Sequence, residues 1–400
     1  MKILMLTPYL PYPPSSGGQV RSYNLIKQLY RKHEITLFSY IRDDGERRFI
    51  KELRKYCKRV EVFKRRKAWS PLNVFLAGVS PYPFLVAIYL SGAFSKSVGR
   101  ALGEEKYDLI HSETFYVMTN IPKTTLPIIL VEQTIEYLVY QHFVSNFKFW
   151  PLKLILKIDV EKLKYWERFF WRKADKVVAV SEADRKSVLD TQPGLNVDLV
   201  PNGVDLDFFV PKKRWRDKEK RILFVSNFKW LQNIEAADLL IREIFPKVKE
   251  KIPGAKLWIV GQHAPESILK LSASDVIIDS VEGDDVEAIR KAYNSASLFV
   301  APLKGPGGTR LKNLAAMASK LPIVTTAIGA SGIGVKDGVH VLIRDSVSDM
   351  VEGIVELLSS PVLARKLADN SRRLAEEEYS WVEMGKKLDK AYKETVHGKS

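Results

Sequence analysis

The sequence has little of the chemistry that cross-links small proteins or binds metal ions. Its one cysteine, Cys57, excludes an internal disulfide and fits a reducing cytosol. The 6 histidines show no HxxxH or HExxH spacing, so no metal site is expected. The first residues, MKILMLTPYLPYPP, lack the cleavage site of a secretory signal and are expected to form a buried strand. We therefore predict a cytoplasmic protein.

A long apolar run free of prolines is also missing. Residues 68–95 carry no charge, but three prolines interrupt them, and these would break a membrane-spanning helix. We expect a core helix with loops there, with a shallow membrane contact as the alternative. Residues 143–173 interleave tryptophan and phenylalanine with lysine and arginine, and Pro151 favours a helix start. A core stripe is favoured there over an interfacial helix, which stays open.

Positive charge is abundant, by contrast. The chain carries 63 Lys and Arg against 47 Asp and Glu, a formal charge of +16. Residues 1–100 alone hold 19 basic and 6 acidic residues, with the basic ones concentrated in Arg47–Lys67. Such a field attracts polyanions: nucleic acid, anionic lipid or phosphate-bearing substrates. No nucleic-acid recognition motif accompanies it, so nucleic acid is not expected as a partner, and a peripheral contact with an anionic membrane surface stays open.

Short β-branched runs alternate with amphipathic stretches along the chain, which is typical of helices packed on parallel sheets. The pattern runs once through the first half, is interrupted by a polar, proline-containing junction near Val204–Lys220, and then restarts. We therefore predict two α/β domains that face each other across a ligand cleft. The expected strands are Lys2–Leu6, Ile35–Ser39, Val60–Phe63, Leu109–His111, Ile128–Val131, Lys176–Val180, Asp198–Val200, Arg221–Val225, Ala255–Val260, Val276–Ile278, Ser297–Ala301, Ile323–Thr325 and Val341–Ile343.

A first glycine-rich motif, PPSSGGQVR, follows the first expected strand and precedes a helix expected near Gln19. Adjacent glycines, Gly17 and Gly18, let a ligand approach the backbone closely, and a helix start offers free amides to an anion. Arg21 could add a positive charge. A plain structural turn after a strand explains the motif equally well.

A second glycine-rich motif, APLKGPGGTRLKNLAAMA, spans residues 301–318 as a strand end, a loop and a helix. Thr309 supplies a hydroxyl, and Arg310 and Lys312 place two cations at the helix start, which favours a diphosphate site. The motif has neither the Walker spacing nor GxGxxG, so a dinucleotide cofactor is not expected. The alternative is a turn with solvated cations.

Six segments, in their order along the chain, resemble the GT-B-fold glycosyltransferases of family four, which are retaining and use nucleotide sugars. They are PYPPSSGGQVRSYNLIKQL, VVAVSEAD with VPNGVDLDFF, ILFVSNFKWLQNIEAADLL, PGAKLWIVG and GTRLKNLAAMASKLPIVTT. The resemblance covers nearly the whole length. It implies two Rossmann-like domains: an acceptor-binding domain over 1–205, a donor-binding domain over 206–378, and a C-terminal helix over 379–400 that packs back on the first domain.

The resemblance also implies roles for individual residues. Arg310 and Lys312 would stabilise the leaving diphosphate, and no metal or other cofactor would be needed beside the nucleotide diphosphate sugar co-substrate. A saccharide or lipid-linked molecule would be the acceptor, with Arg21, Gln133 and Glu136 on its side of the site. The residues expected to bind the donor are Gly17, Gly18, Ser226, Asn227, Gly307, Gly308, Thr309, Leu311 and Ala315.

The sequence departs from the family pattern at several of these positions. Ala315 stands where the family usually has a glutamate that binds the donor ribose, and Ser226 with Asn227 replaces Gly-Arg. Gln232 replaces a lysine, and Gln133 takes the place of a histidine near the reacting sugar. Two functions therefore stand side by side: a retaining hexosyltransferase, which the sequence favours, and a nucleotide-sugar-binding member with weak or no turnover.

Overall fold

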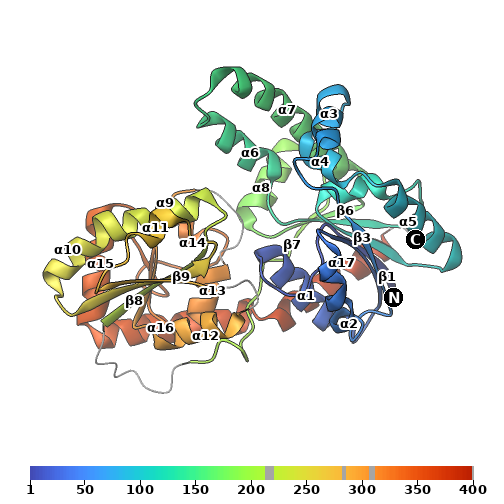
Figure 1. The fold of residues 1–400 in the computed structure, drawn as a ribbon. Coiled ribbons are helices and arrows are strands. Elements are labelled where there is room, and N and C mark those ends of the chain that lie inside the picture. The colour runs from blue at the N-terminus through green and yellow to red at the C-terminus, as the bar shows by residue number, and fades with distance from the viewer. Residues whose placement is uncertain (212–219, 282–284, 306–310, 399–400) are drawn as a thin grey trace. The chain divides into compact units, whose positions relative to one another are not determined.

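The computed structural model describes residues 1–211, 220–281, 285–305 and 311–398. The internal contacts divide the chain into two units (Figure 1). Unit 1 comprises Met1–Pro201 and Gly385–Ser400, and unit 2 comprises Asn202–Met384. Each unit is built on one parallel sheet with helices on both faces, as the alternation in the sequence predicts.

The sheet of unit 1 has the strand order β3-β2-β1-β4-β5-β6-β7, and every neighbouring pair is parallel. The central strands β1, β4 and β5 are buried along almost their whole length, which explains their continuous apolar runs. The strands are β1 (Lys2–Thr7), β2 (Glu34–Ile41), β3 (Arg59–Lys64), β4 (Leu109–Glu113), β5 (Ile128–Glu132), β6 (Lys176–Ala179) and β7 (Val197–Leu199).

The helices of unit 1 connect these strands, and the chain's last helix joins them. The end of α17 is fixed in unit 1 by Asp389, which accepts hydrogen bonds from Lys32 at 2.9 Å and Lys393 at 3.0 Å and contacts the His33 ring at 2.9 Å. The helices are α1 (Gly17–Leu29), η1 (Asp44–Phe49), α2 (Ile50–Leu53), α3 (Pro71–Val79), α4 (Phe84–Tyr89), α5 (Gly92–Glu104), η2 (Phe115–Asn120), α6 (Glu136–Ser145), α7 (Trp150–Lys173), α8 (Glu182–Thr191) and α17 (Trp381–His397).

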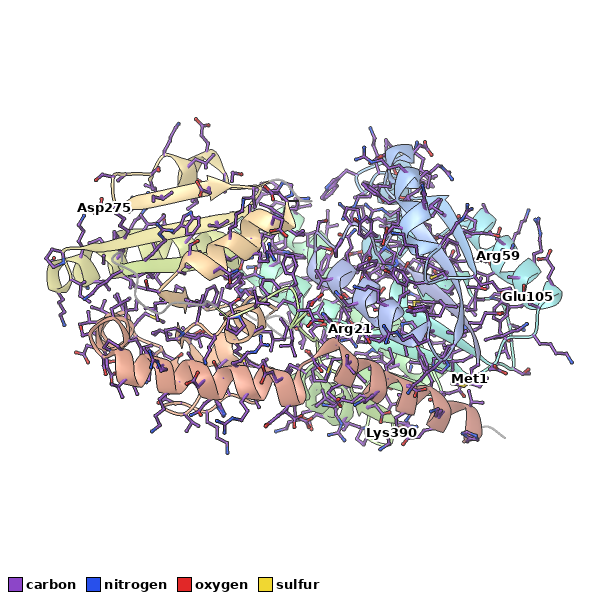
Figure 2. All side chains as sticks on the ribbon, turned by 90° about the horizontal axis from the view of Figure 1, so that it is seen from below. Met1, Arg21, Arg59, Glu105, Asp275 and Lys390 are labelled. Carbon is purple, nitrogen blue, oxygen red and sulfur yellow. The ribbon has the colours of Figure 1, made fainter. Side chains whose placement is uncertain are left out.

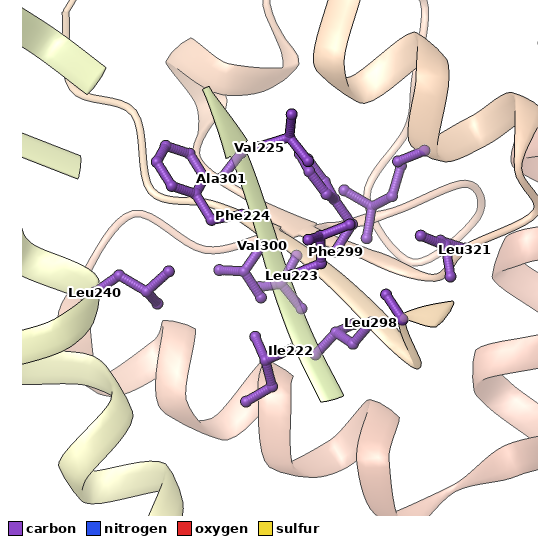
Figure 3. Close-up of a cluster of buried hydrophobic side chains, with 14 of the residues drawn as sticks. Ile222, Leu223, Phe224, Val225, Leu240, Leu298, Phe299, Val300, Ala301 and Leu321 are labelled. Atoms are coloured by element: carbon purple, nitrogen blue, oxygen red, sulfur yellow. The ribbon is translucent and has the colours of Figure 1, made fainter. Parts of the chain in front are cut away.

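The sheet of unit 2 repeats the same order as β10-β9-β8-β11-β12-β13, again all parallel. Apolar side chains of β8 and β11 form the middle of its core, where Leu223, Phe299 and Val300 lie together (Figure 3). The strands are β8 (Lys220–Asn227), β9 (Ala255–Gln262), β10 (Val276–Ser280), β11 (Leu298–Ala301), β12 (Ile323–Thr325) and β13 (Leu342–Ile343).

The helices of unit 2 cover both faces of this sheet. Side-chain caps fix several of their first turns: Ser346, for example, accepts from the Asp349 amide at 3.1 Å. The helices are α9 (Leu231–Leu239), η3 (Leu240–Ile244), α10 (Phe245–Lys251), α11 (Glu266–Leu269), α12 (Val286–Ser295), α13 (Leu311–Ala318), α14 (Ala327–Ala330), α15 (Val347–Ser359) and α16 (Pro361–Glu378).

Each of the thirteen predicted strands overlaps an observed one.

The prediction of a core helix with loops over residues 68–95 was wrong in part. Helix α4 is a core helix, with Val86 and Ala87 fully buried. Helix α3 is not, because four of its apolar side chains are half exposed or more: Leu72, Val74, Phe75 and Val79. Helix α7 is divided: its second half packs Leu163 and Trp171 into the core, while its first half is exposed. A sequence stripe of apolar residues therefore marks core only where the chain also folds over it.

Several cations of the basic run Arg47–Lys67 are paired with acids, which the sequence alone did not indicate. Lys58 pairs with Glu34 at 2.9 Å and Glu105 at 3.7 Å, and Arg59 pairs with Glu61 and Glu104. Figure 2 labels Arg59 and Glu105 at this surface. Much of the positive charge of the run is thus offset by acids brought close by the fold, which weakens it as a polyanion site.

Candidate functional site

In both units the strand order reverses between two neighbouring central strands, β1 and β4 in unit 1 and β8 and β11 in unit 2. Chain connections leave such neighbouring strands in opposite directions, which opens a crevice at their carboxyl ends where ligands bind. The first glycine-rich motif follows β1 and the second follows β11. Each predicted motif therefore lies at the edge of its sheet where this fold binds ligands.

Gly18 lies in the first turn of α1 with two polar side chains directly against it. A Cβ atom at this position would stand 2.3 Å from the Tyr9 hydroxyl and 2.4 Å from the Gln133 Oε1, so no larger residue fits without moving them. Gln133 donates through its Nε2 to both the Tyr9 hydroxyl and the Glu113 carboxylate, the latter at 2.7 Å. Gly17, the first residue of α1, is exposed.

Glu113, the last residue of β4, connects this group to the interior of unit 1. It is 1% exposed, and its Oε1 lies 3.3 Å from the His111 Nε2, while the other ring nitrogen contacts the Tyr392 hydroxyl at 2.6 Å. Burial would raise the pKa of Glu113, but His111, Arg21 and Gln133 together hold that pKa below its ordinary value. The carboxylate is therefore charged at neutral pH.

Arg21, predicted on the acceptor side, belongs to the same interior. Arg21 is 1% exposed, and its guanidinium donates to the Pro201 carbonyl at 2.8 Å. Burial lowers the pKa of Arg21, and the nearby Glu113 carboxylate acts against this by favouring the charged form. Arg21 thus supports the network from inside.

Glu136 forms part of a second group of acids in unit 1. It is the first residue of α6, and its backbone amide donates to Glu167 of α7 at 2.8 Å. Burial raises the pKa of Glu136 to about 7. Glu132, at the end of β5, accepts a hydrogen bond from the Trp171 indole at 3.0 Å. Its pKa is raised well above the ordinary value, mainly by burial and also by the nearby Glu167 carboxylate. These acids bind protons near neutral pH.

In unit 2, Lys312 reaches from the first turn of α13 to the end of β8. Its ammonium donates to the Ser226 hydroxyl at 2.8 Å and to the Asn233 Oδ1 at 2.9 Å, and it lies 5.0 Å from the centre of the Phe224 ring. The Ser226 and Asn233 side chains are both uncharged. These two contacts therefore orient the ammonium without neutralising it, at a helix start where an anion is favoured.

The other residues predicted to bind the donor surround this lysine to different degrees. Asn227, next to Ser226, accepts through its carbonyl from Asn233 and donates through its Nδ2 to Gln262 at 3.0 Å. Leu311 begins α13 and is partly buried, and Ala315, one turn later, is 5% exposed. The structure thus brings Ser226, Asn227 and Lys312 into one group.

The loop before α13 is described in part. A Cβ at Gly305 would stand 2.8 Å from the Cβ of Gln232, so the loop passes directly over the first turn of α9. Gly307, Gly308, Thr309 and Arg310 lie outside the described residues. Among the residues that are described, no group of three or more His, Cys, Asp or Glu side chains is arranged to hold a metal ion.

Four residues of these groups were not predicted from the sequence: Tyr9, His111 and Glu113 in unit 1 and Asn233 in unit 2. Glu113 and Glu132 each end a buried strand, and an acid at the end of an apolar strand is a signal that could have found both. Tyr392 could not have been found this way, because only the return of α17 to unit 1 brings it to His111.

Two sequence profiles match the chain in succession. The family described as "Glycosyltransferase Family 4" matches residues 15–208, and "Glycosyl transferases group 1" matches residues 219–360. The chain belongs to the family 4 glycosyltransferases. The two matches lie on units 1 and 2 respectively, so both sheets of this glycosyltransferase carry family sequence.

Relatives of this glycosyltransferase differ in how much of the chain they match. An uncharacterized 44.6 kDa protein in the cps region of Klebsiella pneumoniae is 22% identical, covering 94% of this chain and 96% of its own length. A D-inositol 3-phosphate glycosyltransferase of Mycolicibacterium smegmatis is 28% identical over 229 residues, which span 52% of this chain and 48% of that protein. The chain therefore spans about half of the relative whose activity is named.

Solved structures match over the full length. Sucrose-phosphate synthase of Thermosynechococcus elongatus has a TM-score of 0.73 at 15% identity and covers 100% of both chains. HepE of Anabaena, solved in complex with UDP-glucose, has a TM-score of 0.64 at 17% identity and covers 98% of this chain and 99% of its own. The predicted GT-B class, with two Rossmann-like sheets, is confirmed.

Proposed function

We propose that this glycosyltransferase moves a hexose from a nucleotide diphosphate sugar to a saccharide or lipid-linked acceptor with retention of configuration, without a metal ion, at the cytoplasmic side of the cell. The observation that carries the proposal is the Lys312 ammonium, held by Ser226 and Asn233 at the switch point of unit 2. A fixed cation beside a glycine-rich loop and a helix start suits a diphosphate.

The reaction needs little from the protein beyond positioning of the two substrates and positive charge at the leaving diphosphate. The bond from the sugar carbon to the diphosphate oxygen breaks with its electron pair going to the diphosphate, and the acceptor oxygen bonds to that carbon from the same side. The acceptor proton passes to the leaving phosphate oxygen. Lys312, and Arg310 by its place in the sequence, would stabilise the charge that develops on the diphosphate.

The glycosyltransferases similar to this chain support the class of donor and acceptor. One was solved with UDP-glucose, and another is named for a phosphorylated inositol acceptor. On the acceptor side, we assign Gln133, with Tyr9, to shape the floor of the acceptor site at the switch point of unit 1, next to Gly18. Glu136, whose pKa burial raises to about 7, would hold a proton there at neutral pH.

The donor is tested by a thermal-shift screen of the native chain against UDP, GDP and TDP sugars. We expect at least one to raise the melting temperature, since a ligand that binds only the folded state stabilises it. NMR of the product made with that donor should then show the donor's anomeric configuration. An inverted product would refute retention, and stabilisation without any transfer or hydrolysis would favour the binding-only function.

Position 315 separates these two functions further. Ala315→Glu restores the usual ribose partner and should tighten donor binding by up to about tenfold, the value of one good polar contact. Ala315→Gln, which is the same size and uncharged, is the matched control. Strong transfer by the native chain, with no gain from Ala315→Glu, would mean that the ribose is held by other groups.

A further inference from the structure

Helix α3 buries a polar side chain and exposes apolar ones, the reverse of the usual arrangement in a surface helix. Its buried residue is Asn73, while Leu72, Phe75 and Val79 are 50%, 61% and 67% exposed. The Asn73 side chain donates to the carbonyls of Lys67 and Ala68 and accepts from Arg66 at 2.7 Å, so the inversion is built by specific contacts. Helix α3 therefore presents its apolar side to the surroundings.

The first half of α7 presents a similar surface. Trp150 and Ile155 are 71% and 64% exposed, and Ile158, one turn later, is 61% exposed. The second half of the same helix is core, so the change from exposed to buried occurs within one continuous helix. Exposed apolar side chains that gather in this way mark an interaction site rather than scattered surface residues.

The two apolar segments are tied together. Lys162 of α7 donates to the carbonyls of Ala77 at 2.7 Å and Ser80 at 2.9 Å, at the end of α3. The Trp166 indole of α7 donates to the Pro81 carbonyl at 2.9 Å. Figure 1 shows α3 and the hairpin of α6 and α7 projecting from the same end of unit 1. Their exposed side chains therefore belong to one part of the surface.

The charge of this surface is positive and lacks acids. Residues 62–103 contain six Lys or Arg and no Asp or Glu, and residues 137–158 contain three lysines and no acid. Lys67, Lys148 and Lys157 are exposed here. This differs from Arg47–Lys64, where acids pair with five of the cations: Arg47, Lys55, Lys58, Arg59 and Lys64.

We propose that residues 67–79 and 148–158, here called the apolar-basic surface, dock this glycosyltransferase on an anionic membrane. Exposed tryptophan and aliphatic side chains enter the headgroup and acyl boundary, while lysines at their edges meet anionic headgroups. No helix within the described residues is long and apolar enough to cross a membrane. A second copy of the chain would bring like charges together, which disfavours it as the occupant.

The proposal deepens the lipid-linked acceptor of the proposed function, but vesicle binding needs neither donor nor turnover. The experiment is flotation of the full chain with vesicles of phosphatidylcholine, with and without phosphatidylglycerol. We expect binding to the anionic vesicles and little to the neutral ones. Equal recovery on the two vesicles, or none on either, would overturn the proposal.

Two triple variants test the two components of the surface. Lys67→Gln with Lys148→Gln and Lys157→Gln should lower the partition coefficient on anionic vesicles by about 100-fold, at the usual contribution of each cation near such a surface. The matched control, Lys247→Gln with Lys251→Gln and Lys366→Gln, removes the same charge from exposed positions of unit 2 and should change it by less than about threefold, because screening limits the effect of distant charges. Equal losses in both would overturn the surface assignment.

The apolar component is tested by Phe75→Ser with Trp150→Ser and Ile155→Ser, compared with Val286→Ser, Val339→Ser and Val362→Ser, which are exposed in unit 2. The first variant should lose vesicle binding and the second should keep it, with unchanged circular dichroism in both. Light scattering reports self-association. A dimer that the first variant abolishes, with vesicle binding retained, would overturn the proposal in favour of a second copy. A nucleotide-sugar thermal shift that persists when vesicle binding is lost would show that the proposed function stands separately.

Discussion

At the carboxyl edge of the unit 1 sheet, polar side chains bond to one another around a buried carboxylate, whereas at the same edge of unit 2 a lysine donates to two uncharged side chains. In unit 1, Gln133 joins Tyr9 to Glu113, and Glu113 contacts His111. In unit 2, Lys312 donates to Ser226 and Asn233. One edge is a network around a carboxylate and the other holds an oriented cation, so the second is better suited to bind an anionic diphosphate.

The largest effect should come from removing that cation. Lys312→Met should lower kcat/KM of transfer by about 100- to 1,000-fold, the cost of losing one oriented stabilising group in an active site. The matched control is Lys304→Met, an exposed lysine of the same loop, which should keep near-native activity. Equal losses in the two variants would mean that general charge, and not the oriented ammonium, assists the reaction.

A smaller effect, on stability, should come from crowding the unit 1 network in which Gln133 joins Tyr9 to Glu113. Gly18→Ala places a methyl group within 2.3 Å of the Tyr9 hydroxyl and should lower the free energy of unfolding by about 1–3 kcal/mol, as overpacking does. Gly99→Ala makes the same change in α5, where the nearest atom, a Pro122 side-chain carbon, is 4.0 Å away, and should not destabilise. Urea denaturation of both variants checks this, and similar midpoints would contradict the close packing at Gly18.

The smallest effect should appear as a pH dependence of unit 1. Burial raises the folded-state pKa of Glu136 from 4.5 to about 7, so the folded chain binds the proton more tightly than the unfolded chain. Stability from this group is present below pH 4.5 and is lost as the pH rises towards 7. The free energy of unfolding of Glu136→Gln, taken relative to that of the native chain, should therefore rise by about 1–2 kcal/mol as the pH is raised from 5 to 8. This value is discounted because the Glu136 side chain is only partly buried. An unchanged difference in urea midpoints at the two pH values would contradict it.

Most of the fold could be predicted from the sequence, because buried parallel strands are continuous apolar runs and all thirteen stand out. The glycine-rich motifs also marked both switch points. The exposure of the apolar side chains of α3 could not be predicted, because it depends on contacts of the buried Asn73 with Arg66 and the preceding loop. The network around Glu113 was missed for a similar reason, since Tyr392 reaches it from the far end of the chain.

The central claim is that Lys312 and its neighbours bind the diphosphate of a donor. The most direct measurement is calorimetric titration of the native chain and Lys312→Met with UDP, GDP and TDP, each against its own monophosphate. The account predicts that one diphosphate binds the native chain about tenfold or more tightly than its monophosphate, as one charge-assisted contact would give, and that Lys312→Met loses this preference. Equal affinities for diphosphate and monophosphate in the native chain, or an unchanged preference in Lys312→Met, would contradict it.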